Sequence, residues 1–529
     1  MNENILVRGV NWIGDAVMTL PALRVLRKAF QESKLSLLVK PSVAALFESS
    51  PFINEVIVYD NNFKGFTGKL RLARTLRKKG FSKAILFQNA FDAAFITYLA
   101  GIPERVGYDR DTRGKFLTKR IPYHDDDRKV HHIDYYLNLL TASGITADRT
   151  EPWIFLSLDE RVAAREKMSG LRRPILGINP GAAYGSAKRW LPERFAEVAG
   201  WFIRDTKGSV VLFGGGNDVD ITFEIEKVVA THHSPVSNYR ANQIASIAQG
   251  SLLNMAEKTS LRELIAMISE CDVFLSNDSG PMHIAYAVGT PLVALFGSTS
   301  PDLTGPVGES NVVIHPDIPC SPCFERTCKN NDMQCMYDIR SDDVYLAIKK
   351  ILPMKPAVFI DRDGTLCEDV NYLSRQEDFR LLPGVVDLMA LKSRGFKLIG
   401  VTNQSGIGRG LVEEGFAKEV NNVFIERFGF DDFFYCPHLP ADYCSCRKPE
   451  PGMLYNARHK YGIDPRKSYV VGDKDADMIV AKAVGAKAVL VRTSKQKDSP
   501  HADYVAEGLK EAVDLIMNDG RTGDDSPLS

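Results

Sequence analysis

The stretch AVFIDRDGT, residues 357–365, joins an apolar run directly to two aspartates, Asp361 and Asp363. Short apolar runs of this kind are typical of buried parallel strands. Two carboxylates at the end of such a strand are costly to bury unless a cation or a reaction uses them. Gly364 permits the sharp turn that would let both aspartates face one point. The stretch therefore predicts an α/β unit with a chemically active site where this strand ends.

Further segments of the C-terminal third repeat this arrangement. KLIGV (397–401) runs into small polar residues, YVVGD (469–473) ends in Asp473, and AVLVR (488–492) is another apolar run. Hydroxyls and free backbone amides after a strand suit phosphate oxygens. A single DxD sequence is more often an ordinary turn. Several such segments in one order indicate a phosphate site, with these additional candidates: Thr402, Asn403, Gln404, Ser405, Arg447, Lys448 and Lys474.

Four soft metal ligands lie close together between two of these segments. Cys436, His438, Cys444 and Cys446 have the pattern C-x-H-x₅-C-x-C. Three thiols and one imidazole suit tetrahedral Zn²⁺. The alternative is four unrelated buried residues. With all four positions filled by protein, we predict a structural zinc site that holds the loop leading to residues 447–448.

These segments together resemble the haloacid dehalogenase superfamily of phosphatases over about residues 356–495. The resemblance implies that Asp361 attacks phosphorus and that Asp363 first donates and then accepts a proton. It also implies Mg²⁺ between the Asp361 carboxylate, the Asp363 backbone carbonyl and Asp473. Further contacts to the phosphoryl oxygens and the substrate are expected from Thr402, Lys448 and Lys474.

Within that superfamily, DRDGT, TNQSGIGRG, the metal loop before RKP, and GDK resemble the D-glycero-D-manno-heptose 1,7-bisphosphate 7-phosphatases. Histidinol phosphatases share most of these features. The resemblance implies substrate contacts from Asp369, Val370, Asn371 and Tyr372. Only five residues separate His438 from Cys444, which leaves the preferred sugar anomer open.

Length and composition limit the possible classes of protein. The chain has 529 residues, 44% hydrophobic and 25% charged, which predicts about three to four globular domains. Lys+Arg and Asp+Glu are 66 each, which argues against a dedicated nucleic-acid binder. No run is long enough to span a bilayer and no signal peptide is evident, so we expect a cytoplasmic protein. Seven of the nine cysteines fall in two clusters, which then indicate thiols or metal ligands.

The remaining chain also alternates strands and helices. Residues 4–8, 35–40, 55–59 and 83–87 are expected strands of one parallel sheet, with a helix over 16–30. A second sheet is expected from 174–181, 210–215, 272–278 and 291–297, and a helix over 341–352. We predict domains at 1–170, 171–352 and 353–518, followed by a disordered tail, 519–529.

Several candidates in these first two domains also have ordinary structural explanations. Asp15, after the first strand, is either a helix-terminus residue or a base at a cleft. Lys188 taken alone is most often a solvated lysine. The sequence 277–283 forms either an anion pocket or a plain capped helix, and its candidates are Asp278, Ser279, Gly280 and His283.

The combination of segments is more specific than any one of them. GDAVMTLPAL (14–23), PGAAYGSAKRWLPERF (180–195), SNDSGPMHIA (276–285) and PLVALFGSTSP (291–301) resemble glycosyltransferase family 9, the ADP-heptose:lipopolysaccharide heptosyltransferases. The resemblance spans about residues 4–350. It implies a GT-B fold of two Rossmann-like domains and an inverting, metal-independent transfer. Asp15 would be the general base, Lys188 would offset charge on the departing diphosphate, and 278–283 would line the ADP-heptose site.

Two features remain outside these motifs. Residues 61–120 contain 14 basic and 4 acidic residues, which is either a solvated face or a surface that docks on anionic lipid and a phosphorylated acceptor. Cys320, Cys323, Cys328 and Cys335 have spacing that permits zinc or an iron–sulfur cluster, although reduced structural thiols are favoured.

The sequence thus predicts a fused bifunctional enzyme of lipopolysaccharide heptose metabolism, a GT-B transferase joined to a phosphatase. Its expected partners are ADP-heptose, the inner-core acceptor, heptose 1,7-bisphosphate and the inner membrane surface, and no nucleic acid. One alternative is a transferase for another nucleotide sugar joined to a histidinol phosphatase. A second is a non-catalytic role for the N-terminal half.

Overall fold

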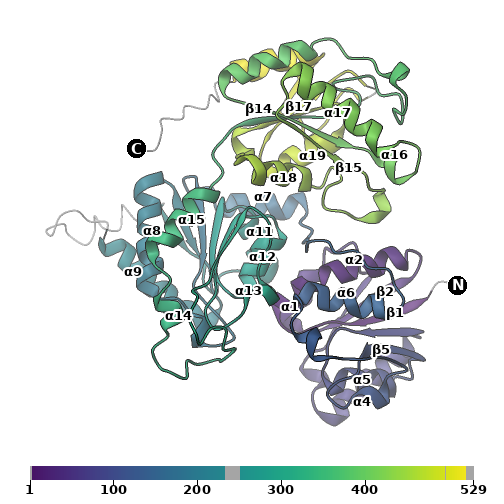
Figure 1. Ribbon diagram of the computed structural model, residues 1–529, viewed down its shortest axis with the longest axis vertical. Coiled ribbons are helices and arrows are strands. Elements are labelled where there is room, and N and C mark those ends of the chain that lie inside the picture. Colours follow the sequence, from purple (N-terminus) through teal and green to yellow (C-terminus); the bar gives the residue numbers. More distant parts are fainter. Residues whose placement is uncertain (1–2, 233–250, 495, 520–529) are drawn as a thin grey trace. The chain divides into compact units, whose positions relative to one another are not determined.

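The computed structural model describes residues 3–232, 251–494 and 496–519, and the chain forms two compact units, Met1–Lys350 and Ile351–Ser529 (Figure 1). The described residues include three six-stranded sheets in which neighbouring strands are parallel. In each sheet the strands, counted along the chain, lie in the order 3-2-1-4-5-6. This order reverses between the first and fourth strands, where ligands bind in such folds. The expected α/β class is confirmed.

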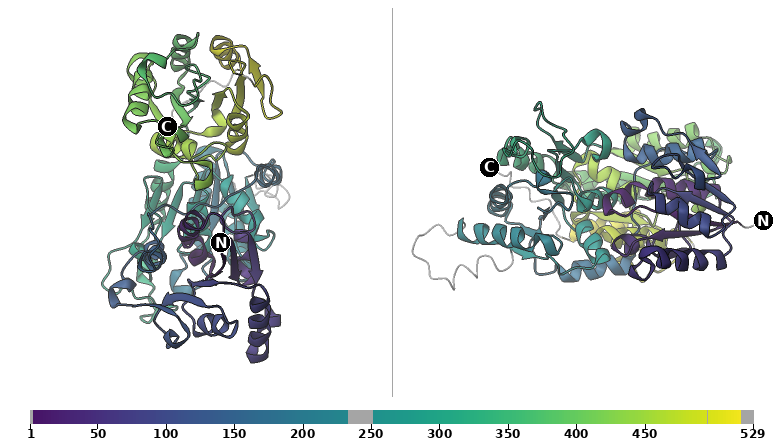
Figure 2. Two further views of the ribbon diagram at one scale, coloured as in Figure 1. Left: turned by 90° about the vertical axis from the view of Figure 1, so that its right-hand side faces the viewer. Right: turned by 90° about the horizontal axis from the view of Figure 1, so that it is seen from below.

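The first sheet lies at the start of the first unit. Its strands are β1 (Asn4–Arg8), β2 (Lys34–Val39), β3 (Glu55–Val58), β4 (Lys83–Leu86), β5 (Glu104–Tyr108) and β6 (Lys119–Ile121). Its helices are α1 (Ile13–Met18), α2 (Leu20–Ala29), α3 (Pro41–Ala44), α4 (Gly65–Lys78), α5 (Phe91–Leu99) and α6 (His132–Ala142). Ile5 and Val7 face one hydrophobic cluster and Leu6 faces another, so helices cover both faces (Figure 2).

The single helix expected over 16–30 is instead two helices, α1 and α2. They meet at Thr19, whose hydroxyl donates to the Ala16 carbonyl at 2.7 Å. Pro21 has no N–H to continue the helical ladder, which explains the break. The break leaves α1 as a short helix carrying Asp15 in its first turn.

The second sheet completes the first unit. Its strands are β7 (Ile175–Asn179), β8 (Ser209–Leu212), β9 (Leu252–Asn254), β10 (Val273–Asn277), β11 (Leu292–Leu295) and β12 (Asn311–Ile314). Its helices are α7 (Leu158–Lys167), α8 (Pro192–Thr206), α9 (Val219–His232), α11 (Leu261–Ser269), α12 (Gly280–Ala287), α13 (Pro301–Thr304), α14 (Gln334–Tyr337) and α15 (Ser341–Ile351). Arg165 of α7 donates to Glu270 beside α11 at 3.0 Å, so the chain reaches this half before residue 170.

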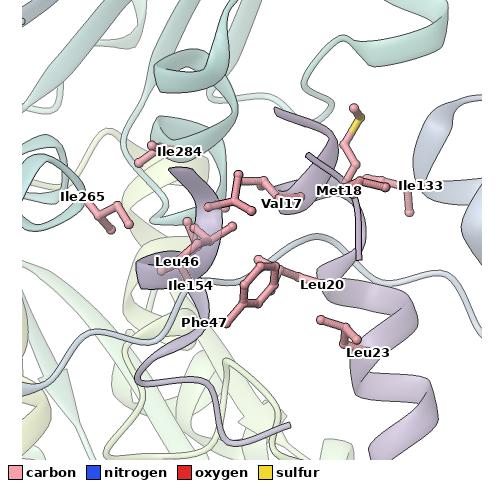
Figure 3. Packing of buried hydrophobic residues seen from close by; sticks show 14 of the residues in the cluster. Val17, Met18, Leu20, Leu23, Leu46, Phe47, Ile133, Ile154, Ile265 and Ile284 are labelled. Atoms are coloured by element: carbon pink, nitrogen blue, oxygen red, sulfur yellow. The ribbon is translucent and has the colours of Figure 1, made fainter. Parts of the chain in front are cut away.

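One hydrophobic cluster joins the two halves of the first unit (Figure 3). It includes Val17 of α1 and Phe47 from the first half, and Ile265 of α11 and Ile284 of α12 from the second. The connecting segment contributes Ile154, whose N–H donates to the Ala287 carbonyl at 3.0 Å. Shared apolar burial of this kind fixes α1 against α12.

The second unit contains the third sheet. Its strands are β13 (Ala357–Ile360), β14 (Lys397–Asn403), β15 (Asp432–Cys436), β16 (Tyr469–Gly472), β17 (Lys487–Val491) and β18 (Tyr504–Ala506). Its helices are α16 (Ser405–Gly408), α17 (Glu414–Phe428), α18 (Gly452–Tyr461), α19 (Asp475–Val484) and α20 (Leu509–Asn518), with a 3₁₀ segment at Val385–Arg394.

The expected tail differs from the structure at its first residue. Asp519 accepts hydrogen bonds from the hydroxyls of Tyr469, at 2.6 Å, and Tyr504, at 2.8 Å. Asp519 therefore belongs to the folded unit, because tyrosine hydroxyls from β16 and β18 hold its carboxylate. Residues 520–529 of the expected tail lie outside the described residues. Across the described ranges, no helix combines the length and apolar character that crossing a membrane requires.

Candidate functional sites

Three buried carboxylates meet where the third sheet reverses its order. Asp361 follows β13, Asp473 follows β16, and Asp477 lies in the first turn of α19. One oxygen from each lies within 4.8 Å of the others. Burial and the nearby Asp361 charge raise the pKa of Asp473 to about 7, and burial also raises that of Asp477 to about 6. Such crowding of like charges away from water fits a divalent cation with oxygen ligands.

Gly364 lets the backbone approach this cluster. Its φ is +92°, and a Cβ there would lie 2.3 Å from Oδ2 of Asp473. A side chain would therefore be excluded both by strain and by collision. The turn after Asp361 consequently packs directly against Asp473, as the expected Mg²⁺ site requires.

Lys448 provides the positive charge facing these carboxylates. Its Nζ donates to Oδ1 of Asp361 at 2.7 Å and to the Val401 carbonyl at 2.8 Å. It also lies 2.6 Å from Oδ1 of Asp477. Burial opposes the charge, but the two carboxylates prevail and raise the pKa of Lys448. Asn403 fixes the backbone of this residue through hydrogen bonds of 3.0 and 3.1 Å.

Asp363 is held separately from the three-carboxylate cluster. The buried guanidinium of Arg362 donates to both of its oxygens, at 3.0 and 3.1 Å, and to Asn421 Oδ1 at 3.0 Å. The side-chain amide of Gln404 donates to Oδ2 at 2.5 Å. These contacts fix the direction of the Asp363 carboxylate.

A cavity of about 230 Å³ opens at this site. Asp361 and Asp363 line this cavity, together with all eleven residues predicted to bind the phosphatase substrate. The lining residues from that prediction are Asp369, Val370, Asn371, Tyr372, Thr402, Asn403, Gln404, Ser405, Arg447, Lys448 and Lys474. Across its mouth Lys474 donates to Asp369 at 3.0 Å. The structure therefore brings together segments from four strand ends.

The predicted metal loop also converges. The Cys436 sulfur lies 3.5 Å from that of Cys444 and 3.6 Å from Nδ1 of His438. The same nitrogen lies 3.3 Å from the Cys446 sulfur. Ligands of a tetrahedral zinc ion with Zn–S of about 2.3 Å are separated by similar distances. Arg447 donates to the His438 carbonyl at 3.3 Å, which links this cluster to the cavity wall.

In the first unit, α1 and α12 approach each other closely. A Cβ at Gly14 would lie 2.6 Å from Cδ2 of His283, and one at Gly280 would lie 3.0 Å from Cβ of Ile13. Burial lowers the pKa of His283 to about 4, so this imidazole stays neutral near pH 7. The carboxylate of Asp15, partly exposed, is close enough to affect both His283 and Tyr136.

Lys188 and Asp278 form a buried pair beside this contact. Lys188 donates to Oδ2 of Asp278, which also accepts from the Thr299 hydroxyl at 2.6 Å. The Ser279 hydroxyl accepts from the Asn179 amide at 3.2 Å. Lys188 is therefore no freely solvated surface lysine, because only 12% of its side chain is exposed. Residues after β7 and β10 thus meet at the second sheet's point of reversal.

The second cysteine loop packs against the turn that precedes Lys188. It carries Cys320, Cys323, Cys328 and Cys335. All four are free thiols, and within the described ranges they are absent from the groups at metal-ligand distance. The loop carbonyl of Arg326 accepts from Ala187 N–H at 3.1 Å, and that of Phe324 accepts from the Tyr184 hydroxyl at 2.9 Å. The loop thereby holds the turn that carries Lys188.

Family comparison agrees with this architecture. Residues 69–334, half of the chain, match glycosyltransferase family 9 (heptosyltransferase). The chain belongs to glycosyltransferase family 9. Residues 445–512 match the HAD-hydrolase-like family. The two matches fall in different compact units.

Different relatives are similar to the N-terminal and the C-terminal parts of this family 9 chain. Lipooligosaccharide heptosyltransferase 2 of Campylobacter jejuni is 29% identical over 350 residues, 66% of this chain and 98% of the relative. The solved heptosyltransferase II of Escherichia coli has a TM-score of 0.55 at 27% identity, with coverage of 66% and 98%. The D-glycero-β-D-manno-heptose-1,7-bisphosphate 7-phosphatase of Haemophilus ducreyi is 42% identical over 178 residues, 31% of this chain and 93% of the relative. The C-terminal part is therefore a HAD-type phosphatase homologue.

Sequence reasoning missed several members of these sites. Asp477 is not among the predicted ligands, although its spacing of four residues from Asp473 is a usable signal. Asn421, Thr299 and His132 gave no local signal, because each comes from a distant element.

Proposed function

We propose that this chain is a bifunctional enzyme of lipopolysaccharide heptose metabolism. Its first unit transfers heptose from ADP-heptose to the lipopolysaccharide inner core. Its second unit hydrolyses the 7-phosphate of D-glycero-D-manno-heptose 1,7-bisphosphate. The observation that carries this proposal is the presence, in one chain, of a family 9 match and a 42%-identical heptose bisphosphate phosphatase relative.

In the proposed phosphatase reaction, Asp361 attacks phosphorus and an aspartyl-phosphate bond forms as the sugar–oxygen bond to phosphorus breaks. Asp363 gives its proton to the departing sugar oxygen and later takes one from a water molecule. The oxygen of that water bonds to phosphorus as the bond from phosphorus to Asp361 breaks, which releases phosphate and restores the Asp361 carboxylate. Thr402 and Lys448 hold the phosphoryl oxygens. Mg²⁺, which HAD relatives imply, fits the carboxylates of Asp361 and Asp473 and would offset phosphoryl charge. The cavity residues 369–372 and Lys474 would orient the sugar.

In the proposed transfer, Asp15 removes the proton of the acceptor hydroxyl as that oxygen bonds to the heptose anomeric carbon. The bond from this carbon to the diphosphate breaks, and the diphosphate leaves with the electron pair. Lys188 offsets that charge, while Asp278, through its contacts with Lys188 and Thr299, fixes the lysine. The site of 278–283 would hold ADP-heptose, and no metal takes part.

Zinc is proposed for the second metal site. The donor set of Cys436, His438, Cys444 and Cys446 fits it in type and spacing. With four protein ligands, the ion would be structural. It would fix the loop from which Arg447 and Lys448 enter the cavity.

Peripheral contact with the inner membrane surface is a further part of the proposal. Basic residues of α4 and its end accompany the exposed ring of Phe66, and Lys115 lies over the rings of Phe91 and Phe116. Anionic lipid would attract this surface, and the protein would remain cytoplasmic. Sedimentation with phosphatidylglycerol vesicles tests it: binding that salt abolishes supports contact, and equal sedimentation with phosphatidylcholine contradicts it.

The decisive experiment assays the full chain twice. ADP-heptose plus a heptose-deficient core acceptor should give a glycosylated product, and heptose 1,7-bisphosphate should release one phosphate. Faster turnover of histidinol phosphate would replace the proposed substrate with the alternative. An Asp15→Ala variant should lose transfer and keep ADP-heptose binding; unchanged transfer would contradict the role of Asp15. No transfer by the wild-type chain would favour a binding role for the first unit.

A further inference from the structure

Asp15 has a titratable neighbour that the proposed transfer does not yet use. His132, the first residue of α6, places Nδ1 at 3.6 Å from Oδ1 of Asp15. The side chains are 39% and 32% exposed, respectively, so both reach solvent. An imidazole at this distance can orient a carboxylate and exchange a proton with it through a small movement or one water molecule.

The adjacent histidine has a different, structural environment. Nδ1 of His131 accepts from the Ile133 N–H at 3.2 Å, which caps α6. Its Nε2 lies 3.1 Å from the Gly305 carbonyl, which belongs to the other half of the unit. Burial lowers the pKa of His131. Both ring nitrogens are therefore engaged, and His131 provides a matched comparison for its neighbour.

The other charged and titratable groups around Asp15 are poorly suited to receive its proton. His283, from α12, is fully buried and stays neutral because its pKa is about 4. Tyr136, from α6, is buried and its pKa is raised. Lys188 and Asp278 pair with each other. Beyond His131, Asp134 pairs with Arg149, and α2 contributes buried apolar residues such as Leu20 and Leu23.

We propose that His132 is a positioning residue for Asp15 and the acceptor of its proton. The acceptor O–H bond breaks and its proton goes to the Asp15 carboxylate, as described above. Asp15 then passes this proton to Nδ1 of His132, which releases it to solvent. The carboxylate is thereby restored for the next transfer. This inference rests on the proposed transferase function.

The pH profile of heptose transfer tests this role in the full chain. The wild type should show a kcat/KM that falls on the acidic side of its profile, since a neutral imidazole accepts a proton and an imidazolium does not. His132→Asn keeps a polar group near Nδ1 but cannot titrate. It should lower kcat/KM at pH 8 about tenfold and remove this limb. His131→Asn, which preserves a capping side chain, should keep the limb.

Each outcome is decisive for the proposal. A wild-type profile without this limb, or an unchanged limb in His132→Asn, overturns it. If His132→Asn lowers kcat/KM by the same factor at every pH and keeps the acidic limb, His132 only supports the structure, and its role as proton acceptor is overturned. Unchanged ADP affinity in the variants excludes unfolding as the cause. The Asp15→Asn variant distinguishes failure of the proposed transferase mechanism from failure of this inference. If Asp15→Asn transfers heptose at the wild-type rate, Asp15 is not the base. If Asp15→Asn loses transfer while His132→Asn keeps the wild-type rate and pH profile, only the role of His132 is removed.

Discussion

Nζ of Lys448 lies 2.7 Å from Oδ1 of Asp361 and thereby joins residues 87 positions apart in the chain. The same ammonium lies 2.6 Å from Asp477. Asp473, the third carboxylate of the cluster, lies 3.9 Å from Nζ of Lys474, so two ammonium groups face three buried carboxylates. The remaining negative charge is what a divalent cation would balance. This relationship leads to the first two predictions.

Replacing Lys448 by methionine should reduce phosphatase kcat about 10²–10³-fold, because a preorganised positive charge on the phosphoryl oxygens is lost. The measurement is phosphate release from heptose 1,7-bisphosphate at saturating Mg²⁺. Lys467→Met, in the same unit but away from the cavity, is the control and should remain close to wild type. Activity of Lys448→Met within threefold of wild type would contradict the role of this lysine.

Asp477→Asn should raise the Mg²⁺ concentration needed for half-maximal phosphatase activity by about 10–100-fold, because outer partners of a metal site influence affinity on this scale. Asp475→Asn is a matched control on the same helix, since Asp475 instead contacts His501 and Ser499. Titration of activity with Mg²⁺ distinguishes the two variants. An identical Mg²⁺ dependence in both would remove Asp477 from the metal site.

Cys444→Ser should abolish zinc binding and lower the melting temperature of the second unit, because metal binding contributes to folding. Elemental analysis of the purified full chain should find one zinc per chain in the wild type and none in the variant. Cys328→Ser, from the other cysteine loop, should keep that zinc. Equal metal content in Cys444→Ser and wild type would show that this cluster is not the zinc site.

His283 should make the stability of the first unit depend on pH. Its pKa is about 4 in the folded state and about 6.5 when unfolded, so the unfolded state binds more protons between these values. The stability is fully present above pH 6.5 and is lost as pH falls toward 4, by roughly 3 kcal/mol. Thermal unfolding from pH 4.5 to 7 measures it. His283→Gln should flatten this dependence, whatever its overall stability, and an equally steep slope would assign the effect to other groups.

Much of the phosphatase site followed from sequence because its residues sit at strand ends. Parallel strands bring their carboxyl ends to one edge, so Asp361, Thr402 and Asp473 could be grouped before any coordinates were known. The zinc ligands were equally accessible, since they are close in sequence and chemically distinctive. Resemblance to known families then supplied the proposed roles and the expected GT-B and HAD-like architecture.

Other contacts required the folded chain. The sequence indicated Asp15 and Lys188 but could not distinguish either from an ordinary surface residue. Only packing of α1 against α12, and of Lys188 against Asp278, gave them a defined environment. The break at Thr19 and the anchoring of Asp519 likewise depended on partners elsewhere.

The amino-acid sequence by itself determined the α/β class and the candidate reactive segments, because periodicity and local motifs encode them. Its resemblance to two known families supplied the two-enzyme organisation. The tertiary structure decided which distant side chains meet: Asn421 with Arg362, Thr299 with Asp278, and His132 with Asp15. The physical reason is that such contacts depend on how helices pack across a sheet. No local spacing in the chain specifies that packing.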